Sequence, residues 1–404
     1  MPVLLEAGQS TYNRGELRGA RLMLSRNNLL AAACSAALLA AVPAAVQIAP
    51  PPPSDPLARI RAAAANPQAC TVEATSPCAQ ANPKIIAGAE SSTTLDANVR
   101  RLVNDIGQRV TGTAAASRAV AWAVEAFKAA GVDDVHTEEF AVPATWGQRR
   151  SRVNMLAPAV GANVVAEIRG REKPDEYVIL SSHLDSWDLG RGALDAGCNA
   201  ALVIEVARLI HLTGLRPRRS IRFVLFSGHE QGKLGSWGYV QAHRVQLDRI
   251  AAAISLDRGT GRVIGFALNG RGDLEAGVRE SLTAFDASWG IARYTTDATL
   301  DSDNLDFLLE GVPSVLGIQE NAGYAGNRHS TADIYDKIDI AALKRNAAVA
   351  GVLAFGVAER EMPLGVRLSR ADTDALLERT GMAASMRQAD LWSLWESHAR
   401  GRLP

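Results

Sequence analysis

The sequence has no excess of either charge, because Lys and Arg together number 43 and so do Asp and Glu. Nucleic-acid-binding proteins usually carry a basic excess or a basic stripe, so this balance argues against that class. The two short arginine clusters, at 149–150 and 216–219, are typical of solvated turns. Internal repeats are also lacking, which leaves an ordinary globular chain to consider.

Cysteine is scarce, with four residues in 404. Cys70 and Cys78 flank a loop-like segment, and a local disulfide between them fits an oxidising compartment, although the sequence does not settle the pairing. Cys34 lies in an apolar run near the N-terminus, where a lipoprotein cysteine is an alternative with a short apolar stretch before it. Cys198 follows Gly197 and has no evident base partner, so we interpret it as a small packed residue.

Charge is absent from residues 29–53, and residues 29–46 are almost entirely Ala, Leu and Val. Arg26 precedes this run, and small residues at 42–45 follow its apolar centre. This pattern predicts a secretory signal over 1–45, with Met23 as the conventional start. An uncleaved anchor is the alternative, but the alanine and proline content favours cleavage. We therefore expect a secreted or periplasmic protein without stable membrane insertion.

The rest of the chain divides by composition and periodicity. With 47% apolar and 21% charged residues, the chain can bury a sizeable core. A Pro/Ala-rich linker or pro-segment is expected over 46–94, a catalytic domain over 95–360 and a C-terminal helical tail over 361–404. Leu391, Trp392, Leu394 and Trp395 of the tail are expected to pack on the domain rather than to bind a partner.

Within 95–360, helical and strand-like segments alternate. Helices are predicted at 95–107, 115–131, 199–212 and 340–357, and strands at 135–142, 153–156, 163–168, 177–182, 220–226, 250–256 and 312–318. Strands separated by helices at this spacing predict an α/β sandwich of three layers with a mixed, mainly parallel central sheet. In such sheets the functional site forms at the carboxyl ends of the strands.

Polar residues follow four of the predicted strands at the expected edge. Two histidines and three carboxylates stand there, a mixture well suited to zinc: His183, Asp195, Glu230, Asp257 and His329. Each residue alone is a weak signal, since an isolated histidine is more often an ordinary core or surface residue. Five such residues in register with strand ends favour a metal centre.

These motifs resemble the di-zinc exopeptidases that include carboxypeptidase Q and bacterial leucyl and aminopeptidase-S-type aminopeptidases. Residues 183–188 and 190–195 are especially similar to the carboxypeptidase Q branch, whose protease-associated insert is missing here. The resemblance implies a phosphorylase/hydrolase-like fold that binds two Zn²⁺ and hydrolyses a peptide or related amide at a chain end. It implies that Asp195 bridges the ions, with His183 and Asp257 on one and Glu230 and His329 on the other.

The resemblance also assigns residues around the metal ligands. Asp185 is expected to accept the ring N–H of His183 and so to fix its tautomer. Asp303 matches a site-lining aspartate. Tyr324 or Arg328 is expected to donate to an oxyanion or a substrate carboxylate.

The chain departs from the family pattern at one catalytic position. The related enzymes carry two consecutive glutamates, a general base followed by a zinc ligand, and here the pair is His229-Glu230. Three outcomes are conceivable: His229 acts as the base, coordinates a metal and quenches the site, or leaves a relative with little turnover. We expect altered or reduced catalysis, with zinc binding retained.

Three rival functions stay open at this point. One is a non-catalytic zinc-binding relative of the same fold, and another is an amide hydrolase acting on N-acyl or xenobiotic amides. The third is glutaminyl cyclase, which uses a single zinc on a similar fold. The expected partner is a peptide or amide small molecule, and the sequence leaves open whether the chain forms a homodimer.

Overall fold

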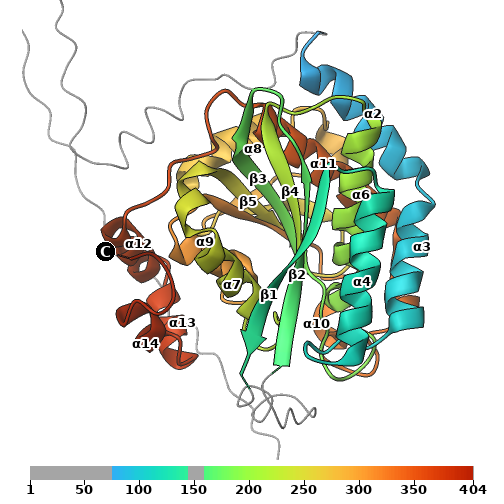
Figure 1. Cartoon of the computed structure of the whole chain (residues 1–404). Helices are drawn as coiled ribbons and strands as arrows, with labels where there is room; N and C mark the ends of the chain where they lie inside the picture. The colour runs from blue at the N-terminus through green and yellow to red at the C-terminus, as the bar shows by residue number, and fades with distance from the viewer. Residues whose placement is uncertain (1–74, 144–158, 404) are drawn as a thin grey trace, which may run out of the picture. The chain divides into compact units, whose positions relative to one another are not determined.

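One eight-stranded sheet forms the middle of the protein (Figure 1). The computed structural model describes residues 75–143 and 159–403. The sheet order is β1-β2-β4-β3-β5-β8-β6-β7. The strands are β1 Asp134–Val142, β2 Ala159–Ile168, β3 Lys173–His183, β4 Arg219–Phe226, β5 Ile250–Ser255, β6 Val263–Ala267, β7 Arg293–Thr295 and β8 Ser314–Gln319. The expected signal at 1–45, the strand expected at 153–156 and Cys70 lie outside the described residues.

The sheet is mixed, with a parallel centre. Strands β4, β3, β5 and β8 run parallel to one another, whereas β2 is antiparallel to both of its neighbours. Strand β6 is antiparallel to β8 and parallel to β7. The predicted α/β class with a mixed central sheet is therefore confirmed. Because the four central strands point the same way, their carboxyl ends meet along one edge of the sheet.

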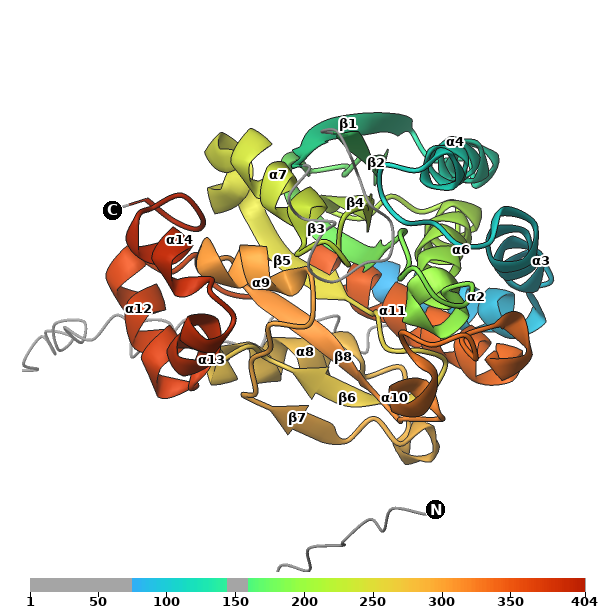
Figure 2. The ribbon, with the colours of Figure 1, turned by 90° about the horizontal axis from the view of Figure 1, so that it is seen from below.

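Helices cover both faces of the sheet, because successive strand residues point to opposite sides and both sides are apolar. One face carries α4 (Ala114–Ala129), α6 (Cys198–Leu212) and α11 (Ile340–Glu359), with α2 (Pro77–Ser91) against α11. The other carries α7 (Leu234–Ala242) and α9 (Asn304–Leu309), as Figure 2 shows. Two hydrophobic cores result, one on each face of the sheet. Leu180 and Phe223 point into the core beneath α6 and α11, and Ile179 and Val224 point into the core on the side of α7 and α9.

Helix α11 is the one described helix whose length and composition would allow it to cross a membrane. Inside the protein, 78% of its most apolar 18-residue window is buried. It packs against α2, α6, α8 (Glu275–Ser281) and the sheet, and Asp339 caps its first turn through the main-chain N–H of Ala342. Its apolar character is thus that of a central core helix.

The C-terminal tail forms α12 (Arg370–Arg379), α13 (Met382–Gln388) and α14 (Trp392–Glu396). Trp395 is buried with Met382 and Met386 of the tail and with Leu305 and Leu309 of α9. The tail therefore packs on the helix that follows Asp303 through Trp395, with Leu391 and Trp392 partly buried against the same cluster.

Two parts of the structure differ from the expectations. Within the segment expected to be a linker, Pro77–Ser91 forms α2, whose residues Ile85 and Ala89 are fully buried against the body. The helix expected at 95–107 is divided into α3 (Thr94–Arg100) and a π-helical turn, Arg101–Ile106, which ends at Gly107. Elsewhere in the described residues, the predicted helices and strands lie within a few residues of their expected bounds.

Candidate metal centre

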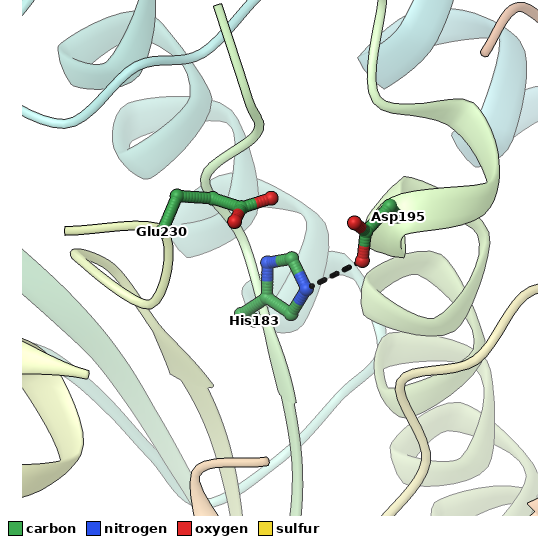
Figure 3. Close-up of side chains that lie close together, drawn as sticks. All are labelled: His183, Asp195 and Glu230. Atoms are coloured by element: carbon green, nitrogen blue, oxygen red, sulfur yellow. Dashed lines mark hydrogen bonds and ion pairs between the residues drawn. The ribbon is translucent and has the colours of Figure 1, made fainter. Parts of the chain in front are cut away.

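The carboxyl edge of the parallel strands brings together side chains from distant parts of the chain. His183 is the last residue of β3, Glu230 lies in the loop after β4, and Asp195 lies in the turn before α6. Figure 3 shows the three side chains pointing toward one another. One ligand atom of each lies within 4.8 Å of the others, and His183 Nε2 is 3.3 Å from Asp195 Oδ1. This spacing suits a shared cation.

His329 completes the cluster from the loop after β8. Its Nε2 lies 3.1 Å from both Asp195 Oδ2 and Glu230 Oε2. Its ring stacks on Trp187, with ring centroids 4.2 Å apart, and its backbone is left-handed with φ of 57°. Although burial opposes the charge, the two carboxylates raise the pKa of His329 to about 9. His329 therefore joins the two carboxylates of the cluster.

Asp257 follows β5 and is 3% exposed. Burial raises the pKa of its carboxyl, and the nearby charges of His229 and His183 oppose that effect. Among the described residues, three buried carboxylate oxygens of the ligand candidates at this edge accept no hydrogen bond: Glu230 Oε1, Asp257 Oδ1 and Asp195 Oδ2, of which the last is in ion-pair contact with His329. Buried charged oxygens without donors are costly, and a metal ion would satisfy them. The donor set of histidine and carboxylate fits zinc.

The expected role of Asp185 is divided between its main chain and its side chain. His183 Nδ1 lies 3.1 Å from the main-chain oxygen of Asp185 and 3.7 Å from its carboxylate, so the main-chain oxygen accepts the ring N–H. The carboxylate instead accepts the main-chain N–H groups of His229 and Glu230, each at 3.2 Å. Asp185 therefore fixes the His183 ring and also holds the loop that carries the next ligand.

His229 lies between a metal-ligand candidate and a buried acid. Its ring stacks on His183 with centroids 4.0 Å apart, and its Nδ1 is 2.9 Å from Asp303 Oδ2. Asp303 is 1% exposed; burial raises its pKa, but His229 outweighs this and brings it down to about 2. Because Nδ1 is turned to Asp303, Nε2 is the ring nitrogen of His229 that remains for another partner.

Tyr324 and Arg328 both face Asp195. The Tyr324 hydroxyl donates to Asp195 Oδ1 at 2.9 Å, and burial raises the pKa of this tyrosine. Arg328 Nε lies 3.7 Å from Asp195 Oδ2, and the Arg328 side chain is 30% exposed. In this arrangement both donors point at the carboxylate that the resemblance assigns to the bridge, within reach of any group bound beside it.

Two residues that the sequence did not single out support the cluster. Arg109 is fully buried and donates to the main-chain oxygens of Leu184 and Gly192. The Asp333 carboxylate accepts the main-chain N–H groups of Leu194 and Asp195, at 2.6 and 3.3 Å. These contacts join residues that are far apart in the sequence, so no motif spacing predicts them. For Asp333, the available signal was its position four residues after His329 in a polar loop.

Comparison with known proteins gives a family match. A model of peptidase family M28 matches residues 163–354. Carboxypeptidase Q of Rattus norvegicus is 33% identical over 200 residues, which cover 49% of this chain and 42% of that protein. Carboxypeptidase Q of Homo sapiens is 32% identical over the same shares. The match thus spans less than half the length of these relatives.

Solved structures show the same fold. A peptidase M28 precursor from Shewanella amazonensis SB2B has a TM-score of 0.63 at 20% identity, over 72% of this chain and 98% of that one. A zinc aminopeptidase from Bacillus subtilis has a TM-score of 0.52 at 16% identity, over 64% and 93%. A glutaminyl cyclase from Porphyromonas gingivalis has a TM-score of 0.53 at 20% identity, over 66% and 98%. At these identities the likenesses concern the fold alone.

Proposed function

We propose, from the match of residues 163–354 to the model of peptidase family M28, that this protein is an exported zinc-dependent hydrolase. Its substrate is a peptide or related amide cleaved at a chain end, in the manner of an aminopeptidase or dipeptidase. The observation that carries this proposal is the convergence of His183, Asp195, Glu230 and His329, together with the buried oxygens Glu230 Oε1 and Asp257 Oδ1, which accept no hydrogen bond within the described residues. The uncharged apolar run at 29–46 supports export.

Two zinc ions are part of the proposal. Asp195 would bridge them, His183 and Asp257 would hold one, and Glu230 and His329 would hold the other. Zinc bound at such a site polarises the scissile carbonyl and lowers the pKa of water. Three carboxylates offset most of the charge of two divalent cations, and the donors Tyr324 and Arg328 remain to stabilise negative charge on the substrate.

In this mechanism His229 moves the proton. Asp303 holds the proton on Nδ1, so Nε2 takes a proton from the attacking water. The water oxygen forms a bond to the carbonyl carbon, the C–N bond breaks, and His229 returns the proton to the departing amine. Water and amide thus give a carboxylic acid and an amine, with no other reactant. His183, stacked on the His229 ring, keeps that ring from turning away.

The experiment is hydrolysis of dipeptides and aminoacyl anilides by purified protein, with and without added zinc. Replacing His229 by Ala should lower kcat by about 10²–10⁴-fold, the usual contribution of a general base, while zinc content stays unchanged. His211→Ala, at an exposed position on α6, is the matched control and should keep full activity. Unchanged turnover in His229→Ala would remove His229 from the mechanism.

The substitution at position 229 also supports a second candidate, a zinc-binding relative without turnover. His229→Glu separates the two, because it restores the glutamate pair of the related enzymes. Activity that appears only in this variant would favour the non-catalytic relative. A screen that includes N-acyl amino acids would detect the alternative amide hydrolase.

A further inference from the structure

A cavity of about 270 Å³ lies beside the metal-ligand edge, over the end of the sheet made by β8, β6 and β7. The strand register explains how it forms. Ala267 of β6 pairs with Leu316 of β8 and Thr295 of β7, so these three side chains share one face. Arg293 lies two residues before Thr295 and therefore points to the same face. The small Ala267 side chain leaves room above this part of the sheet.

Arg258 connects this cavity to the proposed metal site. It follows Asp257 directly, and its main-chain N–H donates to Gln319 Oε1 at 3.1 Å. Gln319 also donates through Nε2 to the main-chain oxygen of Gly259 at 2.7 Å. These two bonds attach the Asp257 loop to the end of β8. The Arg258 side chain lines the cavity, and its Nε lies 3.9 Å from Asp257 Oδ1.

The donors that line the cavity have few partners within the described part of the chain. Arg258 donates through Nη2 to Thr299 Oγ1 over a long 3.4 Å, and its ion-pair contact with Asp257 is at the outer limit. Arg293 makes no side-chain hydrogen bond or ion pair in the described residues. The buried Thr295 Oγ1 has no hydrogen-bond partner there either.

The charge of the cavity lining is positive. Arg258 and Arg293 contribute two positive charges and Asp297 one negative charge, a net of one. A guanidinium with free N–H groups binds a carboxylate through paired, charge-assisted hydrogen bonds, and an adjacent hydroxyl adds a third donor. No apolar ligand would satisfy these groups.

We propose that this cavity is a substrate subsite that receives a carboxylate, held by Arg258 with Arg293 and Thr295 as further donors. The proposal rests on the proposed hydrolase function and names its substrate class: peptides with a negative charge next to the scissile bond. The Arg258 guanidinium lies within 4 Å of an expected zinc ligand, and a residue spans at most about 3.6 Å of chain. The carboxylate is therefore either an acidic side chain or the α-carboxylate of the adjoining residue.

Three peptides distinguish the two sources: glutamyl-alanine amide carries only a side-chain carboxylate, alanyl-alanine only an α-carboxylate, and alanyl-alanine amide neither. Hydrolysis of each is measured as kcat and KM in the wild type, Arg258→Gln, Arg258→Lys and Arg293→Gln. Arg118→Gln, at an exposed position on α4, is the control. Thermal melts show whether each variant folds.

The wild type should prefer one charged peptide over the neutral amide by at least about tenfold in kcat/KM, mainly through KM. Arg258→Gln should remove this preference by lowering kcat/KM for the charged peptide far more than for the neutral amide, Arg258→Lys should keep part of it, and Arg118→Gln all of it. The preferred peptide identifies the source of the carboxylate. Equal rates on all three peptides, or a preference that survives both Arg→Gln variants, would overturn the proposal.

Binding decides the matter separately from turnover. If no peptide is hydrolysed, the proposed function fails, yet isothermal titration of the same three peptides still tests the subsite. Tighter binding of a charged peptide that is lost in Arg258→Gln supports the subsite without catalysis. Equal binding of charged and neutral peptides refutes it.

Discussion

The buried ion pair between Arg400 and Asp306 links the end of the tail to the helix that follows Asp303. Arg400 donates to Asp306 through Nε at 2.7 Å and Nη2 at 2.8 Å, and both side chains are at most 2% exposed. Arg400 also donates to the main-chain oxygen of Gly232, in the loop after Glu230. Arg400→Met removes these donors and keeps much of the side-chain volume.

The cost of this substitution follows from what remains. Without Arg400, the Asp306 carboxylate keeps only the Ser236 hydroxyl, at 2.8 Å, as a side-chain donor in the described residues. Removing one partner of a buried pair leaves an uncompensated charge and costs about 3–5 kcal/mol. Replacing both partners by apolar residues is often close to neutral. The double variant Arg400→Met/Asp306→Leu should therefore be more stable than Arg400→Met.

Urea unfolding followed by tryptophan fluorescence measures these free energies. Arg387→Met is the matched control, because Arg387 pairs with Glu378 at 3.0 Å on the exposed side of the same tail and should cost less than about 1 kcal/mol. A loss in Arg400→Met no larger than that of the control would refute the reasoning. The reasoning would also be refuted if the double variant lost as much free energy of unfolding as Arg400→Met and Asp306→Leu lose together as single variants.

Two further predictions concern pH and packing. Although burial opposes the effect, hydrogen bonds from His136 and His243 lower the pKa of Glu138 to about 2. The ionised Glu138 side chain therefore contributes its full stabilisation of the folded protein above about pH 4.5, and this contribution is lost as the pH falls toward 2. The stability deficit of Glu138→Gln should therefore shrink over that range in urea titrations, unlike that of the exposed Glu139→Gln, and a deficit independent of pH would contradict this. A Cβ at Gly235 would lie 2.2 Å from a main-chain oxygen, so Gly235→Ala should lower the melting temperature by several degrees, and an unchanged melt would show that the loop yields.

The main strands could be predicted because each is an apolar run that ends in polar residues. The edge strands could not, since β7 has three residues and β6 contains Gly265, so neither shows a strand pattern. Helix α2 was missed because Pro83 and a high alanine content make it resemble a linker. Its stability comes from packing against α11, which local sequence does not report.

In the candidate site, too, some residues could be predicted from the sequence and others could not. Ligand candidates such as His183 and Asp257 could be predicted because they stand at or just beyond the ends of apolar strands, and motif spacing set the register of Glu230. Arg109 could not, because its role rests on hydrogen bonds to main-chain oxygens far away in sequence. Side-chain direction was also beyond prediction, as the Asp185 carboxylate shows by binding main-chain N–H groups instead of the His183 ring.

Metal analysis of the purified protein decides whether these side chains hold metal ions at all. After loading with zinc and removal of free ions, plasma mass spectrometry should find two zinc ions per chain. Asp195→Ala, which removes the proposed bridging carboxylate, should lose most of this metal, while Asp188→Ala in the adjacent loop should keep it. A wild-type protein that retains no zinc would contradict the metal centre and the hydrolase function built upon it.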